Sequence, residues 1–397
     1  MKNKNILNLF SSESVSEGHP DKLCDQISDA VLDEALRQDP SSRTAVECLA
    51  TRECIIISGE VTTKAKLDYV KIARDVARKI GYTDDAIGLD ADRMEVQVHV
   101  IQQSPDIAQG VDSSLDDHQI GAGDQGIMFG YATDETENYM PLPLVMAHKL
   151  VRVASNLRHE GKLPHSRPDM KSQVTVNYTG KEPTINAIVF SCQHDEKIAI
   201  EALRKEIMDE VIDPVILSFG FKKDPNFQVF INPTGRFVVG GPAGDTGLTG
   251  RKIIVDTYGG SAPHGGGAFS GKDPTKVDRS AAYAARYAAK NIVAAGLAKR
   301  ALIELSYAIG VSEPVSISLE TYGTETVDKD LILSALVEGK IFDFTPSGII
   351  RKFDLRHPDG FSYEALARYG HFGRPDLRLP WEKLDEVEKL KKYCSKR

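Results

Sequence analysis

The sequence predicts an α+β protein built from three domains of similar size. The chain has 397 residues, which suits two or three domains of ordinary length. Segments with alternating apolar residues, typical of strands, mix with segments whose apolar residues recur every three or four positions, typical of helices. Because this mixture occurs in three successive blocks, we expect three domains that each combine a sheet with helices.

The first block opens with a helix over residues 20–38, since Pro20 suits a first helical position and an apolar stripe follows. The remaining elements of this block are strands within 44–63, a helix over 66–80 ended by Gly81, and a strand over 94–101. The later blocks predict helices over 142–158, 197–217 (with a kink near Pro214), 275–298 and 328–338, and strands over 127–129, 172–178, 185–192, 252–256 and 315–322.

Residues 102–126 interrupt this pattern with a long polar segment rich in glycine. A loop of this length inside a compact chain is usually functional or mobile. We interpret it as a lid over a binding site, and a linker between two domains is the alternative.

Composition narrows the class of protein. The net charge of −8 argues against a nucleic-acid-binding chain. The five cysteines form no paired motif, which favours free thiols in a reducing compartment. No apolar run approaches the length of a membrane span. We therefore expect a cytoplasmic protein that binds neither nucleic acid nor membrane.

The most informative stretch is 259–279, which combines a cluster of glycines with Lys272, Lys276 and Arg279 and leads into an Ala-rich helix. Glycines allow backbone N–H groups to approach a ligand closely. Cations at a helix N-terminus are unfavourable for the helix alone, because that end already carries partial positive charge. We infer that a polyphosphate binds there. Tyr283 and Tyr287 of the helix are expected to pack in the core.

Two glycine patterns resemble known nucleotide motifs, and both are rejected. Residues 121–126 match G-x-G-x-x-G, but they follow a polar loop and precede a strand, whereas a dinucleotide fingerprint opens a helix. Residues 266–272 nearly match a P-loop. There, however, Asp273 stands where a P-loop needs Ser or Thr, and no hydrophobic strand precedes Gly265.

Two further segments could bind phosphate. His19 and Asp21 flank the start of the first helix, where the alternatives are ordinary capping or a phosphate contact and a Mg²⁺ ligand. Asp25, Asp29 and Asp33 follow Asp21 at intervals of four, and we interpret these three as a solvated face. The run 232–252 mixes glycines with arginine and lysine, which fits an anion-binding loop; tight turns alone would explain only the glycines.

Several of these motifs together resemble the S-adenosylmethionine synthetase family. They are GHPDK (18–22), GAGDQG (121–126), GGGAFSGKD (265–273) and DRSAAYAARYAAKN (278–291), and the similarity extends over residues 11–381. The resemblance implies three similar domains about a pseudo-threefold axis. The limits we expect are 1–105, a mobile active-site loop over 106–120, 121–238 and 239–397.

The resemblance also implies a reaction, in which the methionine sulfur attacks C5′ of ATP. The triphosphate that leaves is hydrolysed to pyrophosphate and phosphate. A thioether needs no general base, which agrees with the lack of a recognisable Ser–His–Asp or Cys–His motif. The alternatives are an ATP-dependent phosphotransferase and a non-catalytic nucleotide-binding subunit.

Site residues follow from the matching motifs. The resemblance implies catalytic roles for His19, Asp124, Lys171, Arg251 and Lys272. It implies ATP contacts from His19, Asp169, Lys171, Arg236, Phe237, Asp245, Arg251, Lys252, Ala268 and Lys272, and methionine contacts from Glu60, Gln103, Asp245 and Lys276. Two Mg²⁺ ions would be held at Asp21 and Asp278 and K⁺ at Glu47, in a homodimer or dimer of dimers with active sites at the subunit interface.

Overall fold

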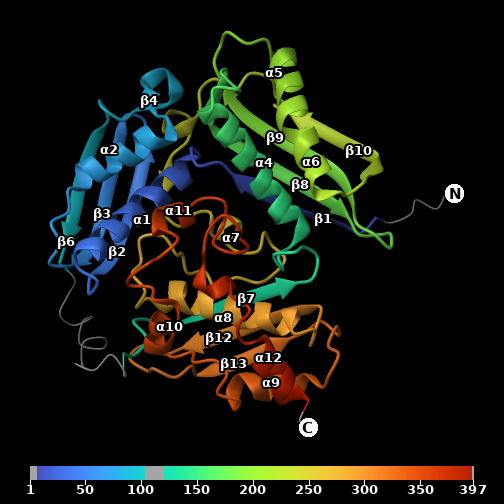
Figure 1. The fold of residues 1–397 in the computed structure, drawn as a ribbon. Coiled ribbons are helices and arrows are strands. Elements are labelled where there is room, and N and C mark those ends of the chain that lie inside the picture. Colours follow the sequence, from blue (N-terminus) through green and yellow to red (C-terminus); the bar gives the residue numbers. More distant parts are fainter. Residues whose placement is uncertain (1–6, 103–119, 396–397) are drawn as a thin grey trace.

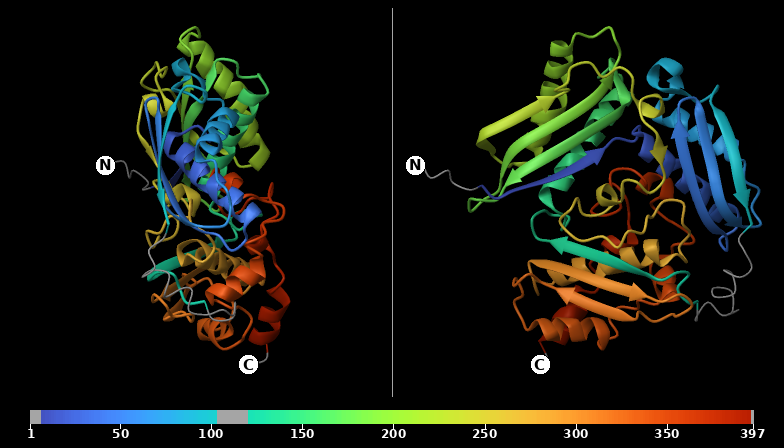
Figure 2. Two further views of the ribbon diagram at one scale, coloured as in Figure 1. Left: turned by 90° about the vertical axis from the view of Figure 1, so that its left-hand side faces the viewer. Right: turned by 180° about the vertical axis from the view of Figure 1, so that it is seen from behind.

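The computed structural model describes residues 7–102 and 120–395 of the chain. These residues form three units, each a β-sheet with helices against it, grouped around a common centre (Figure 1). Most helices lie on one side of the sheets, and the other side is open (Figure 2). The expected α+β class with three sheet-and-helix units is confirmed. Within the described ranges, no helix is long and apolar enough to cross a membrane.

The first unit has a four-stranded sheet in the order β11-β2-β3-β6. Its inner strands alternate between buried and more exposed residues, as expected for a sheet with one covered face. Ile55 and Ile57, for example, are fully buried beneath the helices. The elements are α1 (Pro20–Gln38), β2 (Arg43–Thr51), β3 (Cys54–Thr62), α2 (Tyr69–Ile80), β4 (Thr83–Asp84), β5 (Leu89–Asp90), β6 (Glu95–Ile101) and β11 (Gly247–Leu248).

The second unit has a sheet in the order β1-β8-β9-β10, covered by α4 and by a broken helical segment. The single helix expected over 197–217 is interrupted by a π-helical turn at Met208–Ile212. Pro214 lies in the first turn after this interruption, where its missing N–H is tolerated. The elements are β1 (Leu9–Val15), α4 (Leu142–His159), β8 (Ser166–Asn177), β9 (Thr184–His194), α5 (Ile200–Ile207), α6 (Asp213–Phe219) and β10 (Lys223–Ile231).

The third unit has a three-stranded sheet in the order β13-β12-β7, against which the almost fully buried helix α8 packs. Tyr283 and Tyr287 of α8 are buried, as expected for core residues. The elements are β7 (Gly126–Thr133), α7 (Ile253–Asp256), α8 (Val277–Ala294), β12 (Arg300–Tyr307), β13 (Ser316–Glu320), α9 (Lys329–Val337), α10 (Pro346–Phe353), α11 (Tyr363–Leu366) and α12 (Val387–Cys394).

The three units exchange strands in a cycle. Strand β1, from the start of the chain, pairs with β8 of the second sheet. Strand β7, from the middle of the chain, pairs with β12 of the third sheet, and β11 from the last third pairs with β2 of the first. Each sheet therefore includes a strand from a distant part of the sequence, and these pairings connect the three units.

Two expectations about local structure are wrong. Where a strand was expected over 252–256, residues 253–256 form the short helix α7. Three consecutive apolar residues are too few to distinguish a strand from a helical turn. Asp25, Asp29 and Asp33 are not a solvated face: the first two are fully buried and the third is half-buried.

Candidate active site

Helix α1 presents His19 and Asp21 at its N-terminus, both of them buried. The His19 Nδ1 atom accepts a hydrogen bond of 3.1 Å from the Asp21 backbone N–H, so His19 caps the helix. Burial and the nearby charges of Lys252 and Lys171 lower the pKa of His19 to about 3. The imidazole is therefore neutral at pH 7. Because Nδ1 is the acceptor, Nε2 carries the hydrogen and can donate to a ligand.

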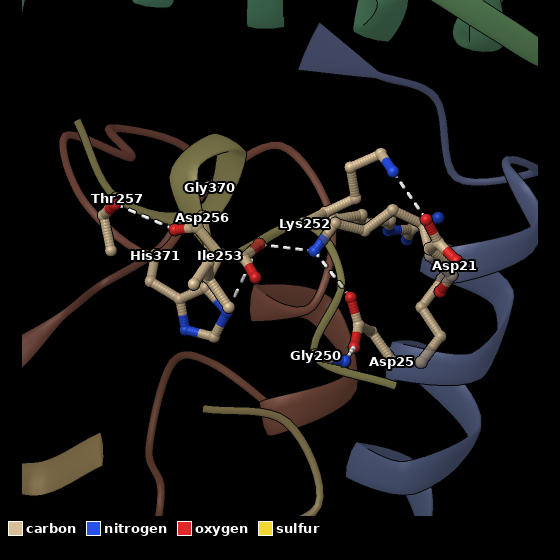
Figure 3. A network of polar contacts seen from close by, with 12 residues as sticks. Asp21, Asp25, Gly250, Lys252, Ile253, Asp256, Thr257, Gly370 and His371 are labelled. Atoms are coloured by element: carbon tan, nitrogen blue, oxygen red, sulfur yellow. Dashed lines mark hydrogen bonds and ion pairs between the residues drawn. The ribbon is translucent and has the colours of Figure 1, made fainter. Parts of the chain in front are cut away.

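A basic loop, residues 248–252, passes over this end of α1. The Leu248 N–H donates to Asp21 Oδ1 at 2.9 Å, and Lys252 Nζ donates to Asp21 Oδ2 at 2.5 Å (Figure 3 labels Asp21 and Lys252). Arg251 Nη1 lies 3.9 Å from the same carboxylate. Burial alone would raise the pKa of Asp21, but the hydrogen bonds from Lys252 and Leu248 hold it below its ordinary value. The two cations and the carboxylate therefore face one another in their charged forms.

The glycine-rich loop, residues 265–272, reaches the same region from the third unit. A methyl group on Gly265 would lie 1.6 Å from the Ile127 carbonyl oxygen, and one on Gly267 would lie 2.2 Å from Asp278 Oδ1. A side chain at Gly265 would collide with the backbone, and one at Gly267 would displace the Asp278 carboxylate, which explains glycine at these two positions. The basic loop touches this loop, since a Cβ at Gly250 would lie 2.7 Å from that of Ala268.

The edge of strand β2 holds both loops in register. Leu248 of the basic loop pairs with Leu49, and the Gly271 carbonyl accepts a hydrogen bond of 3.1 Å from the Val46 N–H. The Asp273 N–H donates to the Thr44 carbonyl at 3.2 Å. Two loops that are distant in sequence therefore extend one sheet edge, side by side above α1.

The cations at the start of α8 all have carboxylate partners. Lys272 Nζ lies 2.5 Å from Asp278 Oδ2, and Lys276 Nζ lies 2.5 Å from Asp273 Oδ2. Arg279 is fully buried and makes two hydrogen bonds, of 2.8 and 2.7 Å, to the Asp29 carboxylate. The expectation that all three cations await a ligand is therefore wrong for Arg279, because its charge is already satisfied inside the protein.

Strand β8 and the loop after β10 lie beside this cluster. Asp169 accepts a hydrogen bond of 2.9 Å from the Gly241 N–H, and burial raises its pKa to about 6. Lys171, two residues along β8, is exposed and close enough to contribute to the low pKa of His19. The Phe237 N–H donates to His194 Nε2 at 3.0 Å. The exposed Arg236 lies 3.3 Å from Glu196, and Asp245 is exposed.

The remaining expected site residues lie apart from this cluster. Glu47 on β2 and Glu60 on β3 are exposed on the open face of the first sheet, opposite to buried neighbours such as Val46 and Cys48. Asp124 is exposed, and its Oδ1 accepts a hydrogen bond of 2.7 Å from the neighbouring Gln125 N–H. Gln103 and most of the expected loop 106–120 lie outside the described residues.

Sequence reasoning missed the carboxylates beneath the loops. Asp25 accepts from the Gly250 N–H at 2.8 Å, and Asp29 accepts from the Gly271 N–H at 2.9 Å. The spacing of four was a usable signal, because like charges at i,i+4 destabilise an exposed helix. A repeated row of aspartates suggests partners supplied from elsewhere.

Three family models match the chain in succession. Models of the N-terminal, central and C-terminal domains of S-adenosylmethionine synthetase match residues 7–105, 119–237 and 239–383. The chain belongs to the S-adenosylmethionine synthetase family. Its strand exchange thus links all three domains of an S-adenosylmethionine synthetase.

Curated relatives agree over nearly their whole length. The chain is 58% identical over 385 residues to the S-adenosylmethionine synthase of Mesoplasma florum, covering 97% of this chain and 99% of that protein. It is 54% identical over 397 residues to that of Mycoplasma capricolum, covering 99% and 100%. It is 53% identical over 394 residues to that of Clostridium botulinum, covering 97% and 99%.

Proposed function

We propose that this chain synthesises S-adenosyl-L-methionine from ATP and L-methionine, releasing pyrophosphate and phosphate. The convergence of the basic loop and the glycine-rich loop above the N-terminus of α1 is the observation that carries this proposal. Full-length similarity to curated S-adenosylmethionine synthases supports it. The alternatives, a phosphotransferase and a non-catalytic nucleotide-binding subunit, are not favoured.

The reaction requires stabilisation of a leaving group more than activation of a nucleophile. The methionine sulfur is nucleophilic without losing a proton, and its attack on C5′ breaks the C5′–O bond. Negative charge then develops on the triphosphate, which Lys272, Arg251 and Lys252 can stabilise. The His19 Nε2–H can donate to the departing oxygen, because His19 is neutral and its Nδ1 is already occupied. By holding ATP, the two loops would also orient C5′ for attack by the sulfur.

The ATP contacts are proposed for the start of α1, the two loops, and the parts of β8 and of the segment after β10 that lie beside them. ATP would contact His19, Asp169, Lys171, Arg236, Phe237, Asp245, Arg251, Lys252, Ala268 and Lys272. Methionine would contact Glu60, Gln103, Asp245 and Lys276.

Family membership implies a need for a divalent metal and potassium. The described residues contain no cluster of three metal-ligating side chains, but Asp21 and Asp278 each already hold a cation, a lysine ammonium at 2.5 Å. Single carboxylates fit Mg²⁺ when substrate phosphate oxygens complete its coordination. We propose one Mg²⁺ at Asp21, a second at Asp278, and K⁺ at Glu47. Bound Mg²⁺ would neutralise charge on the triphosphate.

The open sheet face favours an active site shared between subunits. Glu47 and Glu60 lie on that face, away from the loops on α1, so one chain alone leaves them exposed. A second copy that covers the face would enclose them. We propose a homodimer or a dimer of dimers. The five cysteines are all free, which supports the proposed cytoplasmic location.

Product analysis tests the proposed function. Purified protein with ATP, L-methionine, Mg²⁺ and K⁺ is expected to form S-adenosylmethionine, pyrophosphate and phosphate in equal amounts, identified by mass. Omission of methionine is the control and should prevent adenosyl product formation. Formation of ADP with a phosphorylated acceptor, or tight ATP binding without any turnover, would contradict the proposal.

Replacement of Asp124 by asparagine is expected to slow adenosyl transfer, because the sulfonium product is a cation that a nearby carboxylate would favour. Asp124 is exposed and lies two residues before Gly126, the first residue of β7. Gly126 in turn lies near Asp278. Single-turnover formation of S-adenosylmethionine measures the effect, with Asp134→Asn, another exposed aspartate at the far end of β7, as the control. An unchanged rate in Asp124→Asn would remove this role.

A further inference from the structure

Helix α1 carries a row of four aspartates that face the two loops and the third unit. Asp21, Asp25, Asp29 and Asp33 follow one another at intervals of four, so they lie along one side of the helix. Each accepts at least one hydrogen bond from the backbone N–H of a distant segment. The donors are Leu248 for Asp21, Gly250 for Asp25, Gly271 for Asp29, and Tyr363 and Glu364 for Asp33.

The middle two aspartates hold the peptides that directly precede active-site cations. Asp25 Oδ1 accepts from the Gly250 N–H at 2.8 Å, and the next residue is Arg251. Asp29 Oδ1 accepts from the Gly271 N–H at 2.9 Å, and the next residue is Lys272. A shift in either peptide would move the cation beside it, and misplacement by about 1 Å can cost a hundredfold in rate.

The carboxylates of Asp25 and Asp29 are fully buried, and each forms an ion pair with a buried cation. Lys22 Nζ donates to Asp25 Oδ2 at 2.9 Å and also contacts Asp256. Although burial alone would lower the pKa of Lys22, the two carboxylates raise it above its ordinary value. Arg279 matches Asp29 in the same way, with two hydrogen bonds. A charged acceptor makes a stronger hydrogen bond to a peptide N–H than a neutral one does.

We propose that Asp25 and Asp29, with Lys22 and Arg279 as their counter-ions, are positioning residues that fix the basic loop and the glycine-rich loop in their triphosphate-binding geometry. The Lys22–Asp256 contact extends this link to α7 and the segment around His371, as Figure 3 shows for Asp25, Gly250, Asp256 and His371. The inference rests on the proposed function, because it assigns a purpose to the geometry of that site.

Asp33 provides a matched control on the same helix. It accepts two backbone hydrogen bonds, of 2.9 and 2.8 Å, but they come from the start of α11 and not from either loop. Its loss should therefore destabilise the fold without displacing Arg251 or Lys272. A purely structural role for Asp25 would make the two aspartates equivalent.

Calorimetric binding of inorganic triphosphate to the folded proteins, well below their melting temperatures, separates the two roles. Asp25→Asn is expected to raise the dissociation constant about fivefold and Asp25→Ala about tenfold or more, because the hydrogen bond to a charged acceptor is weakened or lost. Asp33→Asn should lower the melting temperature but leave the dissociation constant within about twofold of wild type.

Two results would overturn the inference. One is a dissociation constant for Asp25→Asn that equals the wild-type value. The other is an equal loss of triphosphate binding in Asp33→Asn. Because asparagine has the size of aspartate, the Asn variants decide the question even where Asp25→Ala does not fold. Wild-type protein that makes no S-adenosylmethionine would instead contradict the proposed function, so the two failures are distinguishable.

Discussion

Replacement of Lys272 by alanine is expected to lower the rate of adenosyl transfer by about a hundredfold, because it removes a cation that we propose stabilises charge on the departing triphosphate. Lys272 is the first residue after Gly271, whose N–H is held by Asp29, and its ammonium lies 2.5 Å from Asp278. The ammonium is only partly exposed, so its interaction with phosphate is less screened than that of a surface lysine. Single-turnover kinetics with saturating ATP and methionine measure the effect.

A surface lysine with the same kind of partner is the control for Lys272. Lys71 contacts Asp75 at 2.5 Å but is largely exposed on α2. Lys71→Ala should leave adenosyl transfer unchanged, and Lys272→Arg, which keeps the charge, should retain more activity than Lys272→Ala. Equal rates for Lys272→Ala and wild type would remove Lys272 from the leaving-group site.

Replacement of His19 by alanine is also expected to slow adenosyl transfer by about a hundredfold, through loss of the proposed Nε2–H donor to the departing oxygen. Since His19 caps α1, the same change should cost stability of about 1 kcal/mol. Asp68 caps α2 through the Lys71 N–H, so Asp68→Ala is a matched cap-loss control. It should lose similar stability but no activity. Equal rates for His19→Ala and wild type would contradict the role.

The low pKa of His19 gives this prediction a pH dependence. Because the pKa is about 3, His19 stays neutral and the rate constant of the chemical step should show no ionisation of this residue between pH 6 and 9. As pH falls below about 6.5, the unfolded chain binds a proton at His19 that the folded chain does not, so stability falls. His19→Ala should therefore lose less thermal stability than wild type between pH 7 and 5.

The long periodic elements of the fold could be predicted, and the short or exchanged ones could not. Helices α1 and α8 were expected because their apolar residues recur at helical spacing over many turns. Strand β1 was not, since its sequence is mostly polar and it pairs with β8, far along the chain. Pairing between distant segments leaves no local pattern, which is also why the cyclic strand exchange could not be foreseen.

The kinds of residue in the site could be predicted from the sequence. Which of its cations are buried in ion pairs could not. His19, Asp21 and the basic loop were expected near phosphate, and the structure brings them together. Arg279 looked the same as Lys272 in the sequence, yet it is fully buried on Asp29. Whether a charged side chain is buried depends on an oppositely charged partner from another segment, and a single sequence does not show which segments meet.

We propose that the two loops hold the triphosphate and that it departs from ATP as one unbroken unit. Rapid chemical quench of wild-type protein with ATP labelled in its γ-phosphate tests this order of bond cleavage. We expect enzyme-bound triphosphate to appear together with S-adenosylmethionine, in equal amount, before pyrophosphate and phosphate are released. Labelled phosphate or ADP that forms ahead of any triphosphate would contradict the claim.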